Sequence, residues 1–94
     1  MNLEFKHVDG DRDDHSVRLL TLSTCIHCKQ AKRLMKELRV SYEYIDVDLS
    51  SMEEKREIGR FLKENGIPII FPVIIIDGEI ITGYREDKIH KLLD

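Results

Sequence analysis

Cysteine, proline, glycine and tryptophan are all scarce in this sequence. Its 94 residues include two cysteines, two prolines, five glycines and no tryptophan, and they contain no repeat and no low-complexity linker. Two cysteines are too few for the disulfide framework of a small secreted domain. Because Cys25 and Cys28 lie only three positions apart, a permanent bridge between them would constrain the unfolded chain very little. We therefore expect this bridge to open and close.

Long apolar runs and an excess of one charge are also missing. No stretch approaches the roughly 18 apolar residues of a membrane span, and the N-terminus lacks the basic segment and apolar run of a secretory signal. We therefore expect a cytoplasmic protein that does not bind a membrane. The formal net charge is −3 and the cationic residues alternate with acidic ones, so the sequence offers no basic face for nucleic acid.

Length and composition are typical of one folded domain. Hydrophobic residues make up 41% of the chain and charged residues 35%, which argues against disorder. A chain of this length buries about 60–70% of the surface that its unfolded form exposes. We expect a single domain over residues 1–94, with an extension at 1–16 and a core at 17–94, that acts as a monomer.

Apolar periodicity divides the core into strands and helices in the order β-α-β-α-β-β-α. The predicted strands are 17–22, 42–47, 71–76 and Glu79–Thr82, and the predicted helices are 25–39, 50–65 and 85–93. The first two strands and their helix form a right-handed βαβ unit, so they are parallel. Because Asp77 and Gly78 form a hairpin turn, the last two strands are antiparallel. The fold class is therefore α/β, with a four-stranded mixed sheet.

The second predicted helix has signals at both of its ends. Ser50 followed by Glu53 matches a capping box at the start, and Gly66 is a natural stop at the end.

Residues 1–16 allow two interpretations. Leu3, Phe5 and Val8 favour an extra strand that pairs with the sheet edge, whereas the polar, charged stretch 9–14 favours a partly ordered tail with a solvated acidic loop.

Cys25 and Cys28 come directly after a buried strand and open the first helix. Unpaired backbone amides and the positive end of the helix dipole stabilise a thiolate at this position. The C-x-x-C spacing brings the second sulfur within bonding distance of the first but leaves it more buried. We therefore expect Cys25 to attack a disulfide and Cys28 to resolve the mixed disulfide that forms.

Three neighbours of the cysteines are candidates for tuning them. An imidazolium or N–H of His27 would stabilise the Cys25 thiolate and make the pair more oxidising, and the alternative is an exposed histidine that points to solvent. Thr24 is expected to cap the helix. We interpret Lys29 as an ordinary solvated lysine rather than as a charge that acts on the sulfur.

Metal binding is the competing chemistry for a C-x-x-C pair. Zinc normally takes four ligands, and the remaining candidates His7, His15 and His90 form neither an H-x-x-x-H pattern nor a second C-x-x-C. We therefore predict no metal site within one chain. A cluster shared between two chains stays open, because a dimer would supply cysteines twice.

Three motifs together resemble the glutaredoxin family. They are Cys25-Ile26-His27-Cys28 after a strand, Phe71-Pro72-Val73 at the third strand, and Gly83-Tyr84-Arg85-Glu86-Asp87 before the last helix. The resemblance spans about residues 17–93 and implies the thioredoxin fold. It implies that Pro72 is cis and faces the cysteines, where neighbouring backbone groups bind a substrate chain. The substrate-binding residues that it implies are Thr24, Ile26, His27, Phe71, Pro72, Val73, Gly83 and Tyr84.

Two details bear on the reductant. The usual Cys-Pro-Tyr-Cys and Gly-Gly turn of glutaredoxins are replaced by Cys-Ile-His-Cys and Thr82-Gly83, and no lysine closely precedes Cys25, so features that recognise glutathione are changed. The stretch from Gly83 to Asp87 is similar instead to the glutaredoxin-like electron donors of ribonucleotide reductase, which a thioredoxin reductase typically reduces. In that comparison Arg85 and Asp87 meet a protein partner; alternatively, Asp87 caps the helix and Arg85 is solvated. Both glutathione and thioredoxin reductase are therefore candidate reductants.

We predict an enzyme, a glutaredoxin-like oxidoreductase that reduces protein or small-molecule disulfides by dithiol exchange. It needs no bound cofactor, because the Cys25–Cys28 disulfide carries the electrons. A second hypothesis is a carrier of an iron–sulfur cluster or metal that uses Cys25, with or without glutathione, at a dimer interface. A third hypothesis is an interaction domain of the same fold whose cysteine pair is idle.

Overall fold

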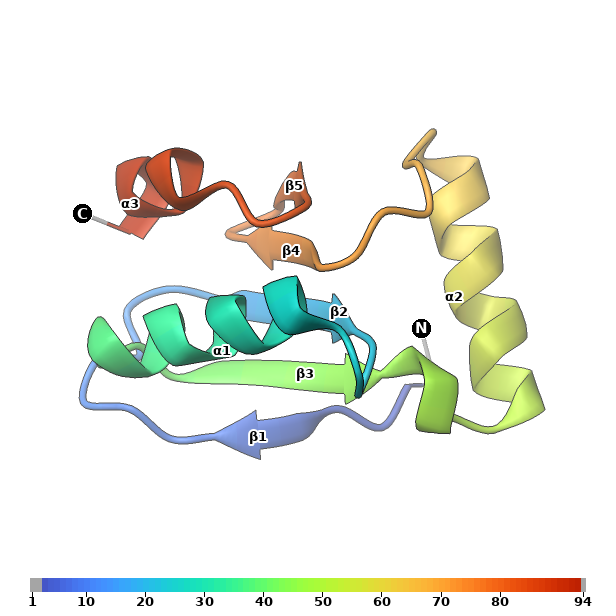
Figure 1. Ribbon diagram of the computed structural model, residues 1–94, viewed down its shortest axis with the longest axis horizontal. Helices are drawn as coiled ribbons and strands as arrows, with labels where there is room; N and C mark the ends of the chain where they lie inside the picture. The colour runs from blue at the N-terminus through green and yellow to red at the C-terminus, as the bar shows by residue number, and fades with distance from the viewer. Residues whose placement is uncertain (1–2, 94) are drawn as a thin grey trace.

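The computed structural model describes residues 3–93, and from residue 17 onward the elements follow the predicted order (Figure 1). The strands are β1 (Lys6–Val8), β2 (Val17–Thr21), β3 (Tyr42–Asp46), β4 (Val73–Ile76) and β5 (Glu79–Thr82). The helices are α1 (Ile26–Glu37), α2 (Met52–Glu64) and α3 (Glu86–Leu93), and a short 3₁₀ helix, η1 (Val47–Leu49), joins β3 to α2. The α/β thioredoxin fold is confirmed.

The five strands form one mixed sheet in the order β1-β3-β2-β4-β5. Strand β2 is parallel to β3 and antiparallel to β4, and β4 and β5 form the predicted antiparallel hairpin. Leu20, near the end of β2, lies between Ile45 of β3 and Val73 of β4. The loop that follows β2 therefore leaves the sheet between the end of β3 and the start of β4.

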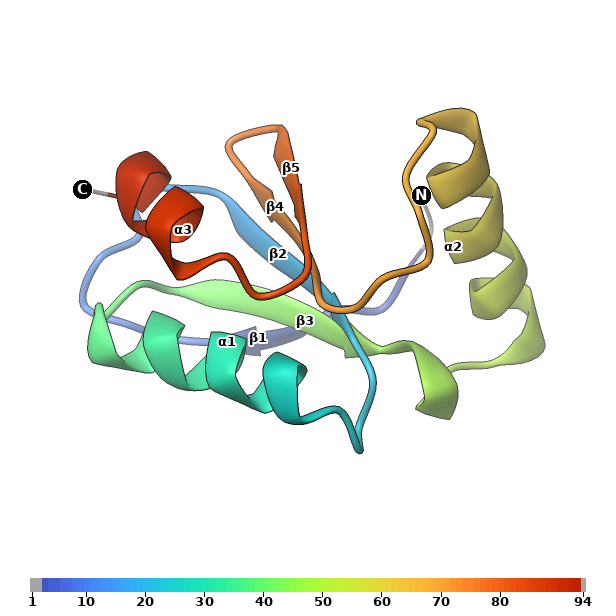
Figure 2. The same cartoon turned by 45° about the horizontal axis from the view of Figure 1, so that its top comes forward.

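Helices cover both faces of the sheet (Figure 2). Leu19 points to the face covered by α1 and α3, where it joins the core that contains Met35 and Ile89. Leu20 points to the opposite face, where the core includes Ile58 of α2. Both leucines are fully buried, and β2 is the middle strand of the five, so the cysteine loop directly follows the central strand of the sheet.

The N-terminal extension contains a strand over residues 6–8, as the first of the two interpretations predicted. Strand β1 pairs antiparallel with β3 at the edge of the sheet. The chain then approaches the turn after α1 so closely that an added Cβ at Gly10 would lie 2.6 Å from the Arg39 carbonyl oxygen. A guanidinium nitrogen of Arg12 donates to the Leu93 carbonyl over 2.6 Å and so reaches the end of α3. The described part of the extension is thus tied to the core at several points.

Helix α2 begins later than predicted. Its N-cap is Ser51 rather than Ser50, and the carboxylate that completes the capping box belongs to Glu54 rather than Glu53. Ser50 is already engaged, because its hydroxyl donates to the Asp46 carbonyl over 3.0 Å.

Helix α1 ends with Arg39 in the left-handed region, at a φ of 58°. The Arg39 amide donates to the Lys36 carbonyl over 3.1 Å and the Val40 amide to the Met35 carbonyl over 3.0 Å, which is a Schellman ending. Glycine usually occupies this position, so the sequence offered no signal for it. Gly66 does so after α2, at a φ of 62°, as predicted.

The strand predicted over residues 71–76 begins only at Val73. Pro72 has no N–H to donate, and its carbonyl accepts from the Gly83 amide over 2.8 Å. Residues 71–72 therefore form a loop beside the sheet. No helix within residues 3–93 is long and apolar enough to cross a membrane.

Candidate active site

Two hydrogen bonds fix the loop that carries the cysteines. The Ser23 amide donates to one carboxylate oxygen of Asp48 over 2.9 Å, and the Ser23 hydroxyl donates to the other oxygen. These bonds from Ser23 lower the pKa of Asp48, which therefore remains an acceptor near neutral pH. The loop after β2 is thus held against η1, the 3₁₀ helix that follows β3 (Figure 1).

Cys25 is the N-cap residue of α1. Its sulfur accepts a hydrogen bond from the Cys28 amide over 3.3 Å, and the sulfur of Cys28 accepts one from the Leu22 amide over 3.5 Å. The prediction that Thr24 caps the helix is wrong, because Thr24 lies exposed in the turn and the Cys25 sulfur occupies the capping position.

The two cysteines differ in exposure. Cys25 is half-buried, whereas Cys28 is fully buried. Burial, together with a hydrogen bond to Cys25, raises the pKa of Cys28 to about 12. Cys28 therefore keeps its proton near neutral pH, and Cys25 is the sulfur that an incoming disulfide can reach.

His27 and Ile26 lie on the outer side of α1, and both are exposed. A ring nitrogen of His27 lies 3.0 Å from the side-chain oxygen of Gln30. The His27 ring is therefore hydrogen-bonded to Gln30 rather than to Cys25. Lys29 is exposed, consistent with a solvated lysine.

The Phe71–Pro72 peptide bond is cis, as the family resemblance implied. Since Leu20 pairs with Val73, residues 71–72 lie beside the chain that leads from β2 to Cys25. Phe71 is half-buried and Pro72 is buried. The side chain of Val73 is fully buried, which leaves it no surface to offer a substrate.

Gly83 and Tyr84 follow β5 on the other side of this loop. Gly83 has a φ of 79°, and its amide bonds to the Pro72 carbonyl. Tyr84 packs against the core under α1 and α3, so only part of its ring is accessible. Asp87 lies in the first turn of α3 rather than at its cap, with a carboxylate oxygen 3.9 Å from a guanidinium nitrogen of Arg85.

Two features near the cysteines were missed from the sequence. The first is a set of exposed apolar side chains on the segments that follow β3 and precede β4, namely Leu49, Met52, Ile69 and Ile70, which add to the predicted Ile26. The second is an ion pair between Lys32 and Asp46, which lie 14 positions apart in the sequence. The sheet register brings Asp46 beside Thr21, just before the cysteine loop, and no sequence spacing signals this contact.

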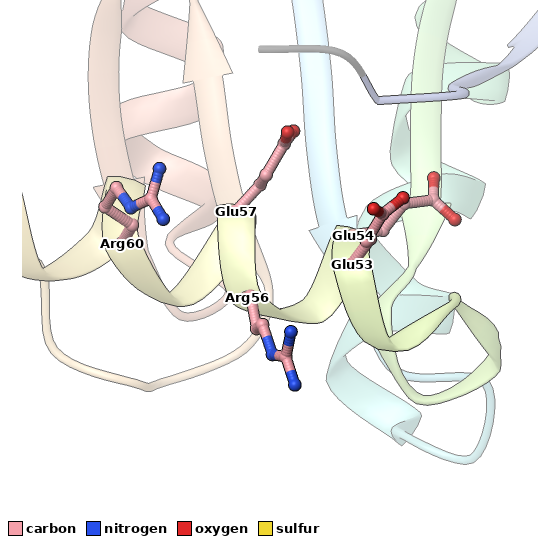
Figure 3. Close-up of a pocket in the computed structure, with 5 residues that line it drawn as sticks. All are labelled: Glu53, Glu54, Arg56, Glu57 and Arg60. Atoms are coloured by element: carbon pink, nitrogen blue, oxygen red, sulfur yellow. The ribbon is translucent and has the colours of Figure 1, made fainter.

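The most voluminous of the described surface hollows lies away from the cysteines. It measures about 430 Å³ and runs along α2, lined by Glu53, Glu54, Arg56, Glu57 and Arg60 (Figure 3). Its lining mixes both charges and contains no apolar side chain, so it does not resemble an enclosed ligand pocket. Within residues 3–93, no group of three or more His, Cys, Asp or Glu side chains is arranged to hold a metal ion.

Comparisons with known proteins agree with this geometry. The family model described as Glutaredoxin matches residues 17–81. An uncharacterised glutaredoxin-like 8.6 kDa protein in the rubredoxin operon of Clostridium pasteurianum is 32% identical over 79 residues, covering 83% of this chain and 97% of the relative. The chain belongs to the glutaredoxin family.

Solved structures of other glutaredoxins have the same fold. The glutaredoxin from Methanosarcina mazei is 33% identical with a TM-score of 0.79, over 95% of this chain and 86% of that one. The glutaredoxin-like NrdH-redoxin from Escherichia coli is 27% identical with a TM-score of 0.68, over 82% of this chain and 93% of that one. Glutaredoxins in general are thiol-disulfide oxidoreductases that work with redox partners and need no prosthetic group, because cysteine sulfurs carry the electrons.

Proposed function

We propose that this glutaredoxin reduces disulfides by dithiol exchange. The thiolate of Cys25 attacks one sulfur of the substrate disulfide, so the substrate S–S bond breaks, one substrate thiolate leaves and a mixed disulfide forms. Cys28 then loses its proton and attacks the Cys25 sulfur. The Cys25–Cys28 disulfide forms, the second substrate thiolate leaves, and both substrate thiolates take up protons. Two electrons pass from the protein to the substrate.

One observation carries this proposal: an accessible sulfur at a helix N-terminus lies directly above a buried thiol of the same helical turn. The Cys28 amide donates to the Cys25 sulfur and so stabilises its negative charge. The buried thiol is shielded from outside disulfides but is hydrogen-bonded to the Cys25 sulfur, so its attack is intramolecular and favoured by proximity.

We propose proteins as the main substrates. Leu49 and Met52 follow β3, and Ile69 and Ile70 precede β4, and these two strands flank β2, which leads to the cysteine loop. All four are more than half exposed, at 52–76%. A rim of exposed apolar side chains fits a protein chain better than a small charged peptide such as glutathione. The E. coli NrdH-redoxin, a structural relative, is described as having a thioredoxin-like activity profile.

The same apolar surface supports a proposal for the physiological reductant, because a reductase is itself a protein. We propose a thioredoxin reductase rather than glutathione, and the reducing cytoplasm as the compartment where the cycle turns over. Offering the oxidised protein separately to glutathione with glutathione reductase, and to thioredoxin reductase with NADPH, distinguishes the two. Faster NADPH oxidation with glutathione would reject this part of the proposal.

Two serine variants test the mechanism with insulin as the disulfide substrate. Cys25→Ser should abolish reduction, because it removes the attacking sulfur. Cys28→Ser should accumulate a covalent mixed disulfide at Cys25, visible by intact mass without reductant and lost on adding dithiothreitol. Full activity of Cys25→Ser would show that the assigned roles are wrong.

A further inference from the structure

A half-buried ion pair lies beside the cysteine site. The Lys32 ammonium is 3.2 Å from a carboxylate oxygen of Asp46, and their side chains are only 23% and 14% exposed. The same ammonium lies 3.9 Å from the centre of the Tyr44 ring. Tyr44 and Asp46 are two positions apart on β3 and so share the face that α1 covers. Lys32 is therefore held over β3 rather than extended into solvent.

Asp46 is itself fixed from the neighbouring strand. The Thr21 hydroxyl, which is fully buried, lies 2.6 Å from the same carboxylate oxygen of Asp46 that Lys32 contacts and 3.2 Å from the Ile45 carbonyl. Its proton can serve either acceptor, and both belong to the end of β3. Contacts from β2 and β3 therefore fix the position of the Lys32 ammonium, although the lysine side chain itself is flexible.

Both ends of this network, Lys32 and Thr21, are connected to Cys28 through the chain. Lys32 follows Cys28 by four positions in α1, so both side chains lie on the same side of the helix. Thr21 directly precedes Leu22, whose amide donates to the Cys28 sulfur over 3.5 Å. Among residues 3–93, the titratable groups that act on Cys28 are Cys25, the N-cap residue of α1, and Lys32 of α1, and Asp46 of β3 faces Lys32. Burial and the hydrogen bond to Cys25 raise the pKa of Cys28, and the charge of Lys32 opposes them with a smaller effect.

An ion pair of this kind adds little stability by itself, because its attraction is offset by the desolvation of both charges. Its fixed position one helical turn after Cys28, on the same side of α1, gives it a different use. We propose that Lys32 is a positioning residue for the resolving step, and that its ammonium, held by Asp46, stabilises the negative charge that develops on the Cys28 sulfur. This inference rests on the proposed function, since the resolving step exists only in dithiol exchange.

Stopped-flow reaction of the reduced protein with 5,5′-dithiobis(2-nitrobenzoate) separates the two steps. Attack by Cys25 releases one thionitrobenzoate at a rate that depends on the reagent concentration. Attack by Cys28 on the mixed disulfide then releases a second one at a rate that does not. The variants are Lys32→Gln, Lys32→Arg and, as a matched loss of charge on the same helix, Lys36→Gln at an exposed position.

Lys32→Gln should slow the second phase and leave the first nearly unchanged. If the pKa of Cys28 rises by about one unit, thiolate falls tenfold while its nucleophilicity rises about threefold, so the second phase slows about 3- to 4-fold. The pH at which this phase reaches a given rate should move up by about half a unit. Lys32→Arg should restore most of the rate because it keeps the charge, and Lys36→Gln should match the wild type.

Two results would overturn this inference alone: a second phase in Lys32→Gln equal to that of the wild type, or equal slowing in Lys32→Gln and Lys32→Arg. The first phase in each variant reports that the site is folded. If the wild-type protein itself released no second thionitrobenzoate, the dithiol mechanism would fail and the inference with it.

Discussion

The peptide N–H of Cys28 donates a hydrogen bond to the sulfur of Cys25 over 3.3 Å. The bond caps helix α1 and stabilises negative charge on the outer sulfur. The buried thiol of Cys28 is hydrogen-bonded to the same sulfur, which it attacks in the resolving step that we propose. One contact therefore both starts the helix and stabilises the sulfur to which we assign the first attack.

The raised pKa of Cys28 makes the reduced protein sensitive to alkali. The unfolded chain loses this proton near pH 9, whereas the folded chain holds it to about pH 12. The contribution to stability is therefore complete below pH 9 and is lost as the pH rises toward 12. We expect the free energy of unfolding in urea to fall on the order of 1–2 kcal/mol between about pH 8 and pH 10.5 because of this group.

Cys28→Ala provides the control for this prediction. The pKa values of Tyr42 and Tyr84 are also raised by burial, so part of the alkaline loss persists in the variant. The reduced wild-type protein should lose more stability than reduced Cys28→Ala over the same pH range. Equal losses in both proteins would contradict the assignment to Cys28.

The exposed apolar rim should matter for protein substrates only. Ile69 is 76% exposed in the loop before Pro72. We expect Ile69→Ser to lower kcat/KM for insulin reduction about 3- to 5-fold, because part of an isoleucine side chain is no longer buried in the complex. Its reaction with 5,5′-dithiobis(2-nitrobenzoate) should be unchanged.

Ile80→Ser on β5 is the matched control, since Ile80 is also exposed, at 40%, but lies outside this rim. Equal effects of the two substitutions on insulin reduction would reject the rim as a docking surface.

Gly10 and Gly59 should respond to alanine in opposite directions. A Cβ at Gly10 would lie 2.6–2.8 Å from backbone atoms of residues 39–41, so Gly10→Ala must push two segments apart. We expect it to cost about 1–3 kcal/mol of unfolding free energy. Gly59, inside α2, has open space around it, and Gly59→Ala should add about 0.5–1 kcal/mol. A neutral Gly10→Ala in urea unfolding would show that the N-terminal extension is not packed as described.

Glu54 and Glu53 are adjacent acidic residues in the first turn of α2 with different partners. The carboxylate of Glu54 accepts from the amides of Ser51 and Glu4, both over 3.2 Å, and these bonds lower its pKa. Glu54→Ala should therefore lower the melting temperature more than Glu53→Ala. A lowered pKa contributes stability above the unfolded value of 4.5 and loses it as the pH falls, so the difference should shrink below about pH 4. A larger effect of Glu53→Ala would favour the helix start one residue earlier.

Much of the fold was predictable because its signals are local. Gly66 ends α2, and Asp77 and Gly78 turn the hairpin with φ values of 50° and 87°. Arg39 was not predictable, since a left-handed arginine is tolerated only where the surrounding chain holds it. Ser51 rather than Ser50 caps α2 for a similar reason: the competing acceptor, the Asp46 carbonyl, is brought into reach by the 3₁₀ helix between them.

The candidate site was also predictable only where its signals are local. The C-x-x-C spacing, the strand before it and the helix after it predicted that Cys25 lies at the start of the helix and that Cys28 is the more buried of the two cysteines. Periodicity and capping act over a few residues, so the sequence contains this information directly.

The residues around the two cysteines, in contrast, depend on the tertiary structure. The strands are arranged β1-β3-β2-β4-β5 rather than in chain order, and this arrangement brings Asp46 to Lys32 and the loop before Pro72 to the cysteines. Such contacts depend on which strands become neighbours when the hydrophobic faces are buried, and no spacing along the sequence specifies them. The local sequence thus predicted the order and the unequal burial of the two cysteines, whereas the packing of the sheet positioned the Lys32–Asp46 ion pair and the exposed apolar side chains.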